Sequence, residues 1–287
     1  MSEGLIRTEP SRSTNVAAPA SSGASRNRRA SVLAELWRYR ELLRSLVVRD
    51  LKVKYQRSLL GLVWTLLNPL LTVMILVAVF SHVIRIDIGN YWAFLISGFF
   101  VWNFISQVLS HTTSLLSNHA SLSRSVYFPR EILVLSAALS KLVEFLIEIG
   151  LVLVVLIVFH HHFVPASWIL FPVLVLIQLV LALGLMFPLA VISVLFYDVQ
   201  HALPILITSL FYLTPVFYPV SMIPEHVRPF FYLNPFVGIL DLYHTVLYEG
   251  AWPSLGLLSL ETAAATAFLI VGYAVFTRYK RVCIEIA

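Results

Sequence analysis

Long apolar runs separated by short polar connections dominate this chain. About 20 consecutive apolar residues suffice for a helix to cross a bilayer, and these runs lack the polar–apolar alternation of barrel strands. The pattern therefore predicts an all-α polytopic membrane protein with six transmembrane helices. Asn68-Pro69 should kink the first of them, because proline leaves a backbone carbonyl without its helical donor. The expected spans are 62–84, 91–116, 132–159, 168–196, 203–217 and 255–276.

The region before the first span divides into two parts. Residues 1–30 are rich in Ser, Ala, Asn and Arg and hold no apolar run, which is typical of a disordered cytoplasmic tail. Residues 31–58 place apolar side chains near helical spacing with basic residues between them, which predicts an amphipathic interfacial helix. Residues 59–287 then form the six-span domain. Candidate functional residues of the interfacial helix are Trp37, Arg44, Arg49 and Lys52.

The connection between spans two and three, SLSRSVYFPREILVL at 121–135, carries two arginines. Pro129 suits the first turn of the following helix, where its missing N–H would be unpaired anyway. We predict a short cytoplasmic coupling helix that transmits a push from a soluble partner, although its arginines could equally bind lipid headgroups. The candidate coupling residues are Ser121, Arg124, Tyr127, Phe128, Arg130 and Glu131.

Residues 218–253 differ from the spans because prolines and aromatic residues interrupt them repeatedly. Two short helical segments are expected near 224–233 and 235–248, and neither is long enough to cross a bilayer. We therefore predict an external re-entrant helical hairpin between spans five and six, buried in protein or lining a cavity.

The composition indicates a membrane protein, and the distribution of basic residues indicates which side of the membrane its ends face. Hydrophobic residues make up 59% of the chain and charged residues 12%, with a mean hydropathy of +0.86, which excludes an ordinary soluble domain. Of the 20 Lys and Arg residues, 12 lie within residues 1–57. Such a charge excess marks a cytoplasmic flank facing anionic lipids rather than a nucleic-acid partner. Six spans then place both termini in the cytoplasm.

Sequence motifs for catalysis are absent: there is no GxxxxGK[ST], HExxH, CxxC or GxSxG. We expect a non-catalytic subunit whose ATP hydrolysis, if any, belongs to another chain. His160-His161-His162 does not favour a metal site, because consecutive side chains point in different directions. The single Cys283 excludes an internal disulfide.

Three charged residues lie deep in the third span, at Lys141, Glu144 and Glu148. Their spacing places them on one helical face. The pattern favours a Lys141–Glu144 pair near the inner interface, with Glu148 hydrogen-bonded to another helix. A proton relay through Glu148 is the alternative.

Aromatic residues in spans two and five and in the hairpin could form a channel or gate, since flat rings stack on sugars without holding them tightly. The alternative is ordinary packing and an interfacial aromatic belt. The candidates are Phe99, Trp102, Phe211, Tyr212, Phe217, Tyr218, Phe231 and Tyr232.

Four segments in this order resemble the permease subunit of type-2 ABC exporters for polysaccharides. They are LLRSLVVRDLKVKYQRSLLGLVWTLLNPLL at 42–71, RSVYFPREILVLS at 124–136, LFYDVQHALPILITSLFYLTPVFYP at 195–219 and IPEHVRPFFYLNPF at 223–236. Tyr197 departs from the family, which often has Arg there.

The resemblance implies a homodimer in the bacterial inner membrane with two copies of an ABC ATPase subunit. ATP and Mg²⁺ would be held by that partner, and this chain would need no cofactor. The substrate would be a lipid-linked glycan of the O-antigen, capsule or teichoic acid type. Alternatives are an exporter of a drug or lipid with the same fold, an ATP-independent secondary carrier using Glu148, or a membrane scaffold.

Overall fold

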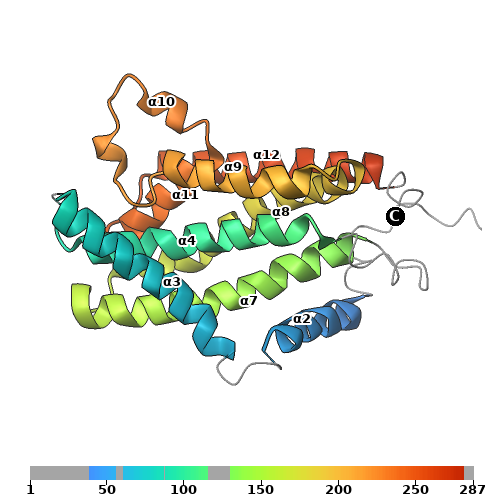
Figure 1. Ribbon diagram of the computed structural model, residues 1–287. Helices are drawn as coiled ribbons and strands as arrows, with labels where there is room; N and C mark the ends of the chain where they lie inside the picture. The colour runs from blue at the N-terminus through green and yellow to red at the C-terminus, as the bar shows by residue number, and fades with distance from the viewer. Residues whose placement is uncertain (1–38, 56–60, 87, 116–129, 281–287) are drawn as a thin grey trace, which may run out of the picture. The chain divides into compact units, whose positions relative to one another are not determined.

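The computed structural model describes residues 39–55, 61–86, 88–115 and 130–280, and these residues contain helices and no strand (Figure 1). The helices are α2 (Arg40–Tyr55), α3 (Gly61–Ala78) with η1 (Val79–Val83), α4 (Tyr91–Thr112), α7 (Glu131–Leu156) with η2 (Ile157–His161), η3 (Ala166–Leu170) with α8 (Phe171–Leu195), α9 (Val199–Leu213), η4 (Val220–Met222), α10 (Arg228–Phe231), α11 (Pro235–Tyr243) with η5 (His244–Tyr248), and α12 (Leu255–Tyr279). The predicted tail 1–30 lies outside the described residues.

Helix α4 forms the centre of the bundle. It packs against α3, α7, α8, α9 and α11, and 78% of its span is buried. Its sequence is mostly apolar, as expected for a helix surrounded by other helices, and its few polar residues include Asn103 and Gln107. Helices α8 and α12 form the most extensive pair beside it.

Within the described residues, four helices are long and apolar enough to cross a membrane: 91–112, 131–161, 166–195 and 255–279. These four agree with predicted spans two, three, four and six. The apolar helices at 67–83 and 199–213 are shorter and correspond to predicted spans one and five.

The fifth predicted span begins and ends earlier than expected. α9 starts at Val199 and ends at Leu213, where Thr214 adopts an extended backbone conformation before Pro215. Gln200 and His201, which precede the predicted span, therefore lie inside the helix. The turn is shorter because the amide of Ala202 already donates to the carbonyl of Asp198 at 2.9 Å.

Helix α3 runs through Asn68-Pro69 without interruption. The Thr72 hydroxyl donates to the carbonyl of Asn68 at 3.1 Å. This carbonyl is not the one that Pro69 leaves without a helical donor, which belongs to Thr65, four residues before the proline.

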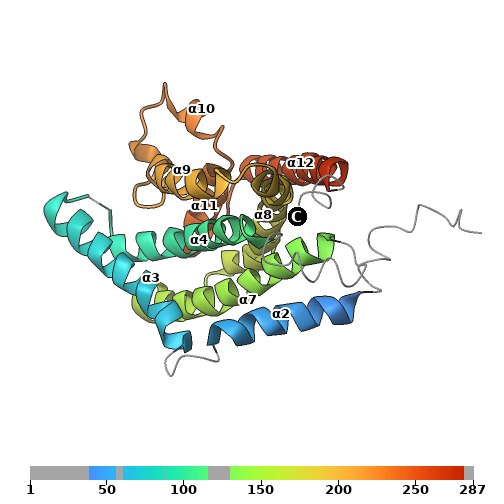
Figure 2. The same cartoon turned by 45° about the vertical axis from the view of Figure 1, so that its right-hand side comes forward.

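Two short helices occupy the predicted hairpin between α9 and α12. In Figures 1 and 2, α10 stands away from the bundle while α11 lies against it. α11 packs on α4, α8 and α12, and most of its side chains are buried. Asn234 caps α11 by accepting from the Phe236 amide at 3.0 Å, and Pro235 occupies its first turn.

Polar contacts mark two ends of the bundle. At the hairpin end, the Tyr248 hydroxyl donates to the carbonyl of Gly89 at 2.5 Å, and His160 bonds the carbonyl of Tyr248 at 2.9 Å. At the opposite end, which we call the tail end, Lys280 pairs with Glu131. Connections alternate between the two ends, as they should for helices that cross a membrane in turn.

Candidate functional site

Of the six candidate coupling residues, only the last two, Arg130 and Glu131, lie among the described residues. Ser121, Arg124, Tyr127 and Phe128 lie outside the described residues. Arg130 donates from Nη1 to the carbonyl of Lys280 at 3.3 Å, and Glu131 forms an ion pair with the Lys280 ammonium. The start of α7 is thus tied to the end of α12, two positions 149 residues apart in sequence. The interaction with a soluble partner stays a prediction.

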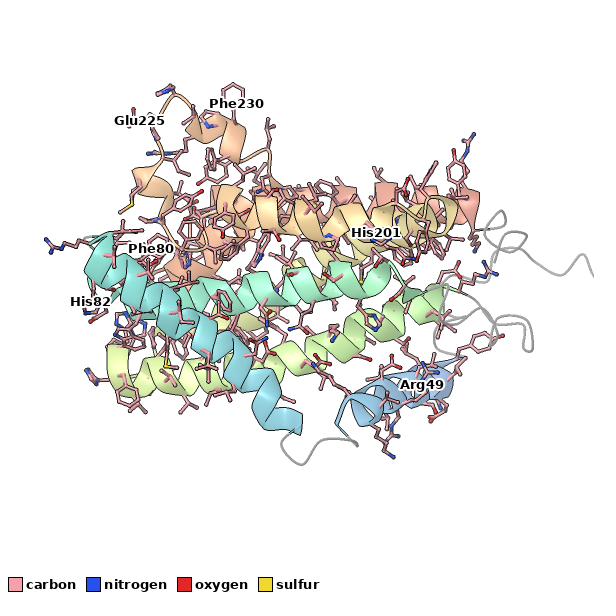
Figure 3. All side chains as sticks on the ribbon, viewed as in Figure 1. Arg49, Phe80, His82, His201, Glu225 and Phe230 are labelled. Atoms are coloured by element: carbon pink, nitrogen blue, oxygen red, sulfur yellow. The ribbon has the colours of Figure 1, made fainter. Side chains whose placement is uncertain are left out.

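A helix, α2, lies within the predicted segment 31–58 and packs mainly on α7 (Figures 1 and 2), while its place in the membrane interface stays a prediction. Trp37 lies outside the described residues. Arg44 and Lys52 are exposed. Arg49, labelled in Figure 3, donates to Asp50 at 2.9 Å. Most of the predicted cationic side chains therefore stay available for lipid or a partner.

Lys54 was absent from the sequence candidates, yet it forms an ion pair between α2 and α7. Its ammonium lies 2.7 Å from Oε2 of Glu144 on α7. Lys141 approaches the same oxygen at 3.0 Å. The predicted Lys141–Glu144 pair is confirmed, and the additional partner was missed because it lies 90 residues earlier in the chain.

The polar contacts continue from α7 to α4. Lys141 donates to Oε1 of Gln107 at 3.3 Å, and Asn103 donates to Oε2 of Glu148 at 3.3 Å. The prediction that Glu148 bonds another helix is therefore confirmed. Its other oxygen, Oε1, is buried and has no hydrogen-bond partner in the described part of the chain.

Six of the eight aromatic candidates meet in one cluster. Phe211 on α9 contacts Phe99 and Trp102 on α4, with ring centroids 6.4 and 5.9 Å apart. Phe217 contacts Phe211 at 5.5 Å and extends the cluster to Tyr212 and Tyr218.

The cluster also includes a ring that sequence reasoning missed. Phe80 in η1, labelled in Figure 3, lies 5.0 Å from Phe217. The cluster therefore joins η1, α4, α9 and the segment after α9. Phe99 and Trp102 are buried within the chain, whereas Tyr212 is 62% exposed. The α4 rings of the cluster are therefore enclosed by the chain, whereas the ring of Tyr212 faces outward.

Phe231 and Tyr232 lie apart from this cluster, at the end of α10. The Tyr232 hydroxyl donates to Oδ2 of Asp241 at 3.1 Å. Burial, assisted by the adjacent Asp241 carboxylate, raises the pKa of Tyr232 to about 12, so the phenol keeps its proton at neutral pH. Phe230 and Glu225 project from the same segment and are exposed (Figure 3).

The three consecutive histidines lie at the hairpin end. Nε2 of His161 is 2.7 Å from the carbonyl of Leu247, and His160 stacks on Tyr248 with ring centroids 5.2 Å apart. Nδ1 of His160 also meets the Asn90 amide at 3.2 Å. These nitrogens bind other groups of the chain, which agrees with a structural connection rather than a metal site. In the residues that the structure describes, no three His, Cys, Asp or Glu side chains are placed to hold a metal.

The described structure therefore combines a bundle of membrane-length helices with helix α2 before the first apolar helix and the two short helices α10 and α11 before the last. These features are those of a polytopic helical membrane protein. Residues 41–248 match the family described as ABC-2 type transporter, and the chain belongs to that family.

Three relatives show which kinds of transporter in this family the chain is similar to. The chain is 36% identical over 249 residues to the O-antigen export system permease protein RfbA of Myxococcus xanthus, covering 85% of this chain and 95% of that protein. A Klebsiella pneumoniae protein of the same description is 30% identical over 245 residues, covering 84% and 92%. The polysialic acid transport protein KpsM of Escherichia coli is 20% identical over 209 residues, covering 72% and 81%.

Proposed function

We propose that this chain is the transmembrane permease subunit of an ATP-driven exporter that moves a lipid-linked polysaccharide across the bacterial inner membrane. The observation that carries the proposal is the full-length similarity to O-antigen export permeases, which extends over 85% of this chain. The match to KpsM supports the same substrate class. A polysaccharide of the O-antigen, capsule or teichoic acid type fits these relatives better than a drug or a lipid.

The exporter would contain two copies of this chain and two copies of an ABC ATPase subunit that binds ATP and Mg²⁺. Membership of the ABC-2 family supports the ATPase partner. Exposed apolar side chains on α3 and α9, including Met74, Ile75, Ile205 and Leu206, offer a surface for the second copy. A path between the two copies would then pass the exposed side of the aromatic cluster at Tyr212.

The tail end would face the cytoplasm and the ATPase. The basic side chains Arg130, Arg278 and Lys280 gather there, whereas Arg85 and Arg228 belong to the hairpin end. This distribution follows the positive-inside rule. The stretch 121–131 would receive the movement of the ATPase, and the hairpin would close the outer mouth.

Purification of the tagged chain from its host in mild detergent tests the partner directly. We expect a stoichiometric subunit with a GxxxxGK[ST] loop, and proteoliposomes of this complex should export a lipid-linked glycan only with hydrolysable ATP. Replacing Arg130 or Tyr127 with Asp should preserve folding but abolish export while ATP hydrolysis continues. Export that persists with an ATPase-inactive partner would refute the proposal and favour a carrier that uses Glu148.

A further inference from the structure

Glu144 joins two helices that are distant in sequence. Its carboxylate is 5% exposed and accepts from Lys54 at 2.7 Å and from Lys141 at 3.0 Å. Lys141 belongs to the same helix, three residues earlier, whereas Lys54 comes from the last turn of α2. The same buried carboxylate is therefore shared between α7 and α2.

Electrostatics make this contact resistant to separation. A buried carboxylate is stable only when it is paired, because its charge has left water. Lys54 is 35% exposed and Lys141 15% exposed, so solvent screens the Lys54 contact only in part. Withdrawal of Lys54 would leave Glu144 with one partner on its own helix.

Apolar contacts fix α2 in the same register. Leu46 is buried, and Leu43, Val47 and Leu51 are partly buried. Their spacing of three and four residues places them on one helical face, and Lys54 follows three residues after Leu51 on that face. The apolar stripe and the ion pair therefore bind α2 to α7 together.

The position of α2 depends on α7 far more than on its neighbour in sequence. α2 packs mainly on α7 and makes few contacts with α3, although only residues 56–60 connect it to α3. A displacement of α7 that carried α2 with it would therefore act directly on the start of the first apolar helix.

We propose that Glu144 is a positioning residue that makes α2 and the tail-end half of α7 move as one body, with Lys54 as its counterpart. This inference rests on the proposed function, in which the stretch before α7 receives the movement of the ATPase. α7 would then transmit that movement to α3 through α2, and not only along its own axis.

Replacing Glu144 with Gln tests the role of the charge with little change in shape. We expect Glu144→Gln to lower the amount of glycan exported per ATP hydrolysed by about 2- to 30-fold, because changes in side chains that couple distant sites have effects of this size. ATP hydrolysis itself should continue. The matched control is Glu41→Gln on α2, because the Arg40–Glu41 pair is 57% and 77% exposed and contributes little.

A crosslink between positions 54 and 144 provides the second test. It distinguishes a positioning role of the ion pair from a general loss of protein stability. In a Cys283→Ser background, the Lys54→Cys/Glu144→Cys variant removes the ion pair and should export poorly per ATP hydrolysed. Joining the two cysteines with a short bifunctional thiol reagent should restore the ratio, because the helices are again held together. The reagent should leave the Cys283→Ser chain unaffected.

Three outcomes would overturn the inference or its basis. A normal ratio of export to hydrolysis in Glu144→Gln would refute the positioning role alone. A crosslink that fails to restore the ratio would show that holding α2 and α7 together is not the role of Glu144, and a further loss on crosslinking would show in addition that the two helices must separate during transport. Absence of ATP-dependent export by the wild-type complex would instead refute the proposed function, and this inference with it.

Discussion

The contact between α8 and α12 depends on two glycines, Gly184 and Gly272, at which the backbones of the two helices touch. Substitution of one of these glycines therefore tests the fold. A Cβ atom built on Gly272 would lie 2.0 Å from the carbonyl oxygen of Gly184. A Cβ atom on Gly184 would lie 2.6 Å from the backbone nitrogen of Leu269. Close backbone approach through small residues is a common way for membrane helices to associate. We predict that Gly272→Ala destabilises the bundle.

The magnitude follows from this geometry. Carbon and oxygen atoms in contact stay about 3.3 Å apart, so a methyl group at position 272 requires the two helices to separate by more than an ångström. Overpacking of this kind costs about 1–3 kcal/mol. The higher helix propensity of Ala returns up to about 1 kcal/mol. Subtracting the full propensity gain leaves a net loss of up to about 2 kcal/mol, or up to about 8 °C in Tm.

The effect is measured by heating the detergent-solubilised chain and determining the fraction that still elutes as native protein. The matched control is Gly150→Ala in the middle of α7, because nothing lies within 4 Å of a Cβ atom at that position. This control gains helix propensity without a clash and should be as stable as the wild type or more so. Equal Tm values for Gly272→Ala and Gly150→Ala would refute the close α8–α12 contact.

Two further predictions concern buried contacts of α11 and η5. Tyr243→Phe should lower stability by about 1–3 kcal/mol, because the Tyr243 hydroxyl donates to Gln178 at 2.5 Å in the core. The exposed Tyr212→Phe is its control in the same thermal assay, and equal losses would contradict the buried contact. Gly98→Ala should destabilise by about 1–3 kcal/mol, since its Cβ atom would lie 2.3 Å from Nε2 of His244. Shortening His244 to Ala in the Gly98→Ala variant should then cost less than in the wild type, and additive losses would contradict a clash.

Much of the fold could be predicted from local pattern. The four membrane-length helices begin and end within a few residues of the expected positions, since long apolar runs and their polar ends are local signals. The prolines also placed the two short helices of the hairpin: Pro235 opens α11, and Asn234 before it supplies the cap. α9 was harder, because its true end depends on the extended backbone at Thr214 and not on the apolar residues that follow.

Contacts between distant segments could not be predicted in the same way. Lys141 and Glu144 are three residues apart, and helical geometry alone brings them together. Lys54 reaches Glu144 only because α2 packs on α7, and no periodicity in residues 31–58 indicates which helix lies beneath that face. Likewise, Phe80 joins the aromatic cluster only because η1 and the segment after α9 meet at the hairpin end.

Two of the three ion pairs that the structure describes for α7 link it to other helices, and they give a physical reason for the role proposed for the stretch that precedes it. Glu131 attaches the first turn of α7 to the end of α12, and Glu144 attaches the same helix, 13 residues later, to the end of α2. These ion pairs therefore connect α7 to both α12 and α2, although the three helices are far apart in sequence. A push on residues just before Glu131 cannot move α7 alone unless one of these buried carboxylates loses its partner, which is unfavourable inside the protein. Under the proposed mechanism the movement would instead be shared with α12 and α2, and through α2 with the first apolar helix of the membrane domain.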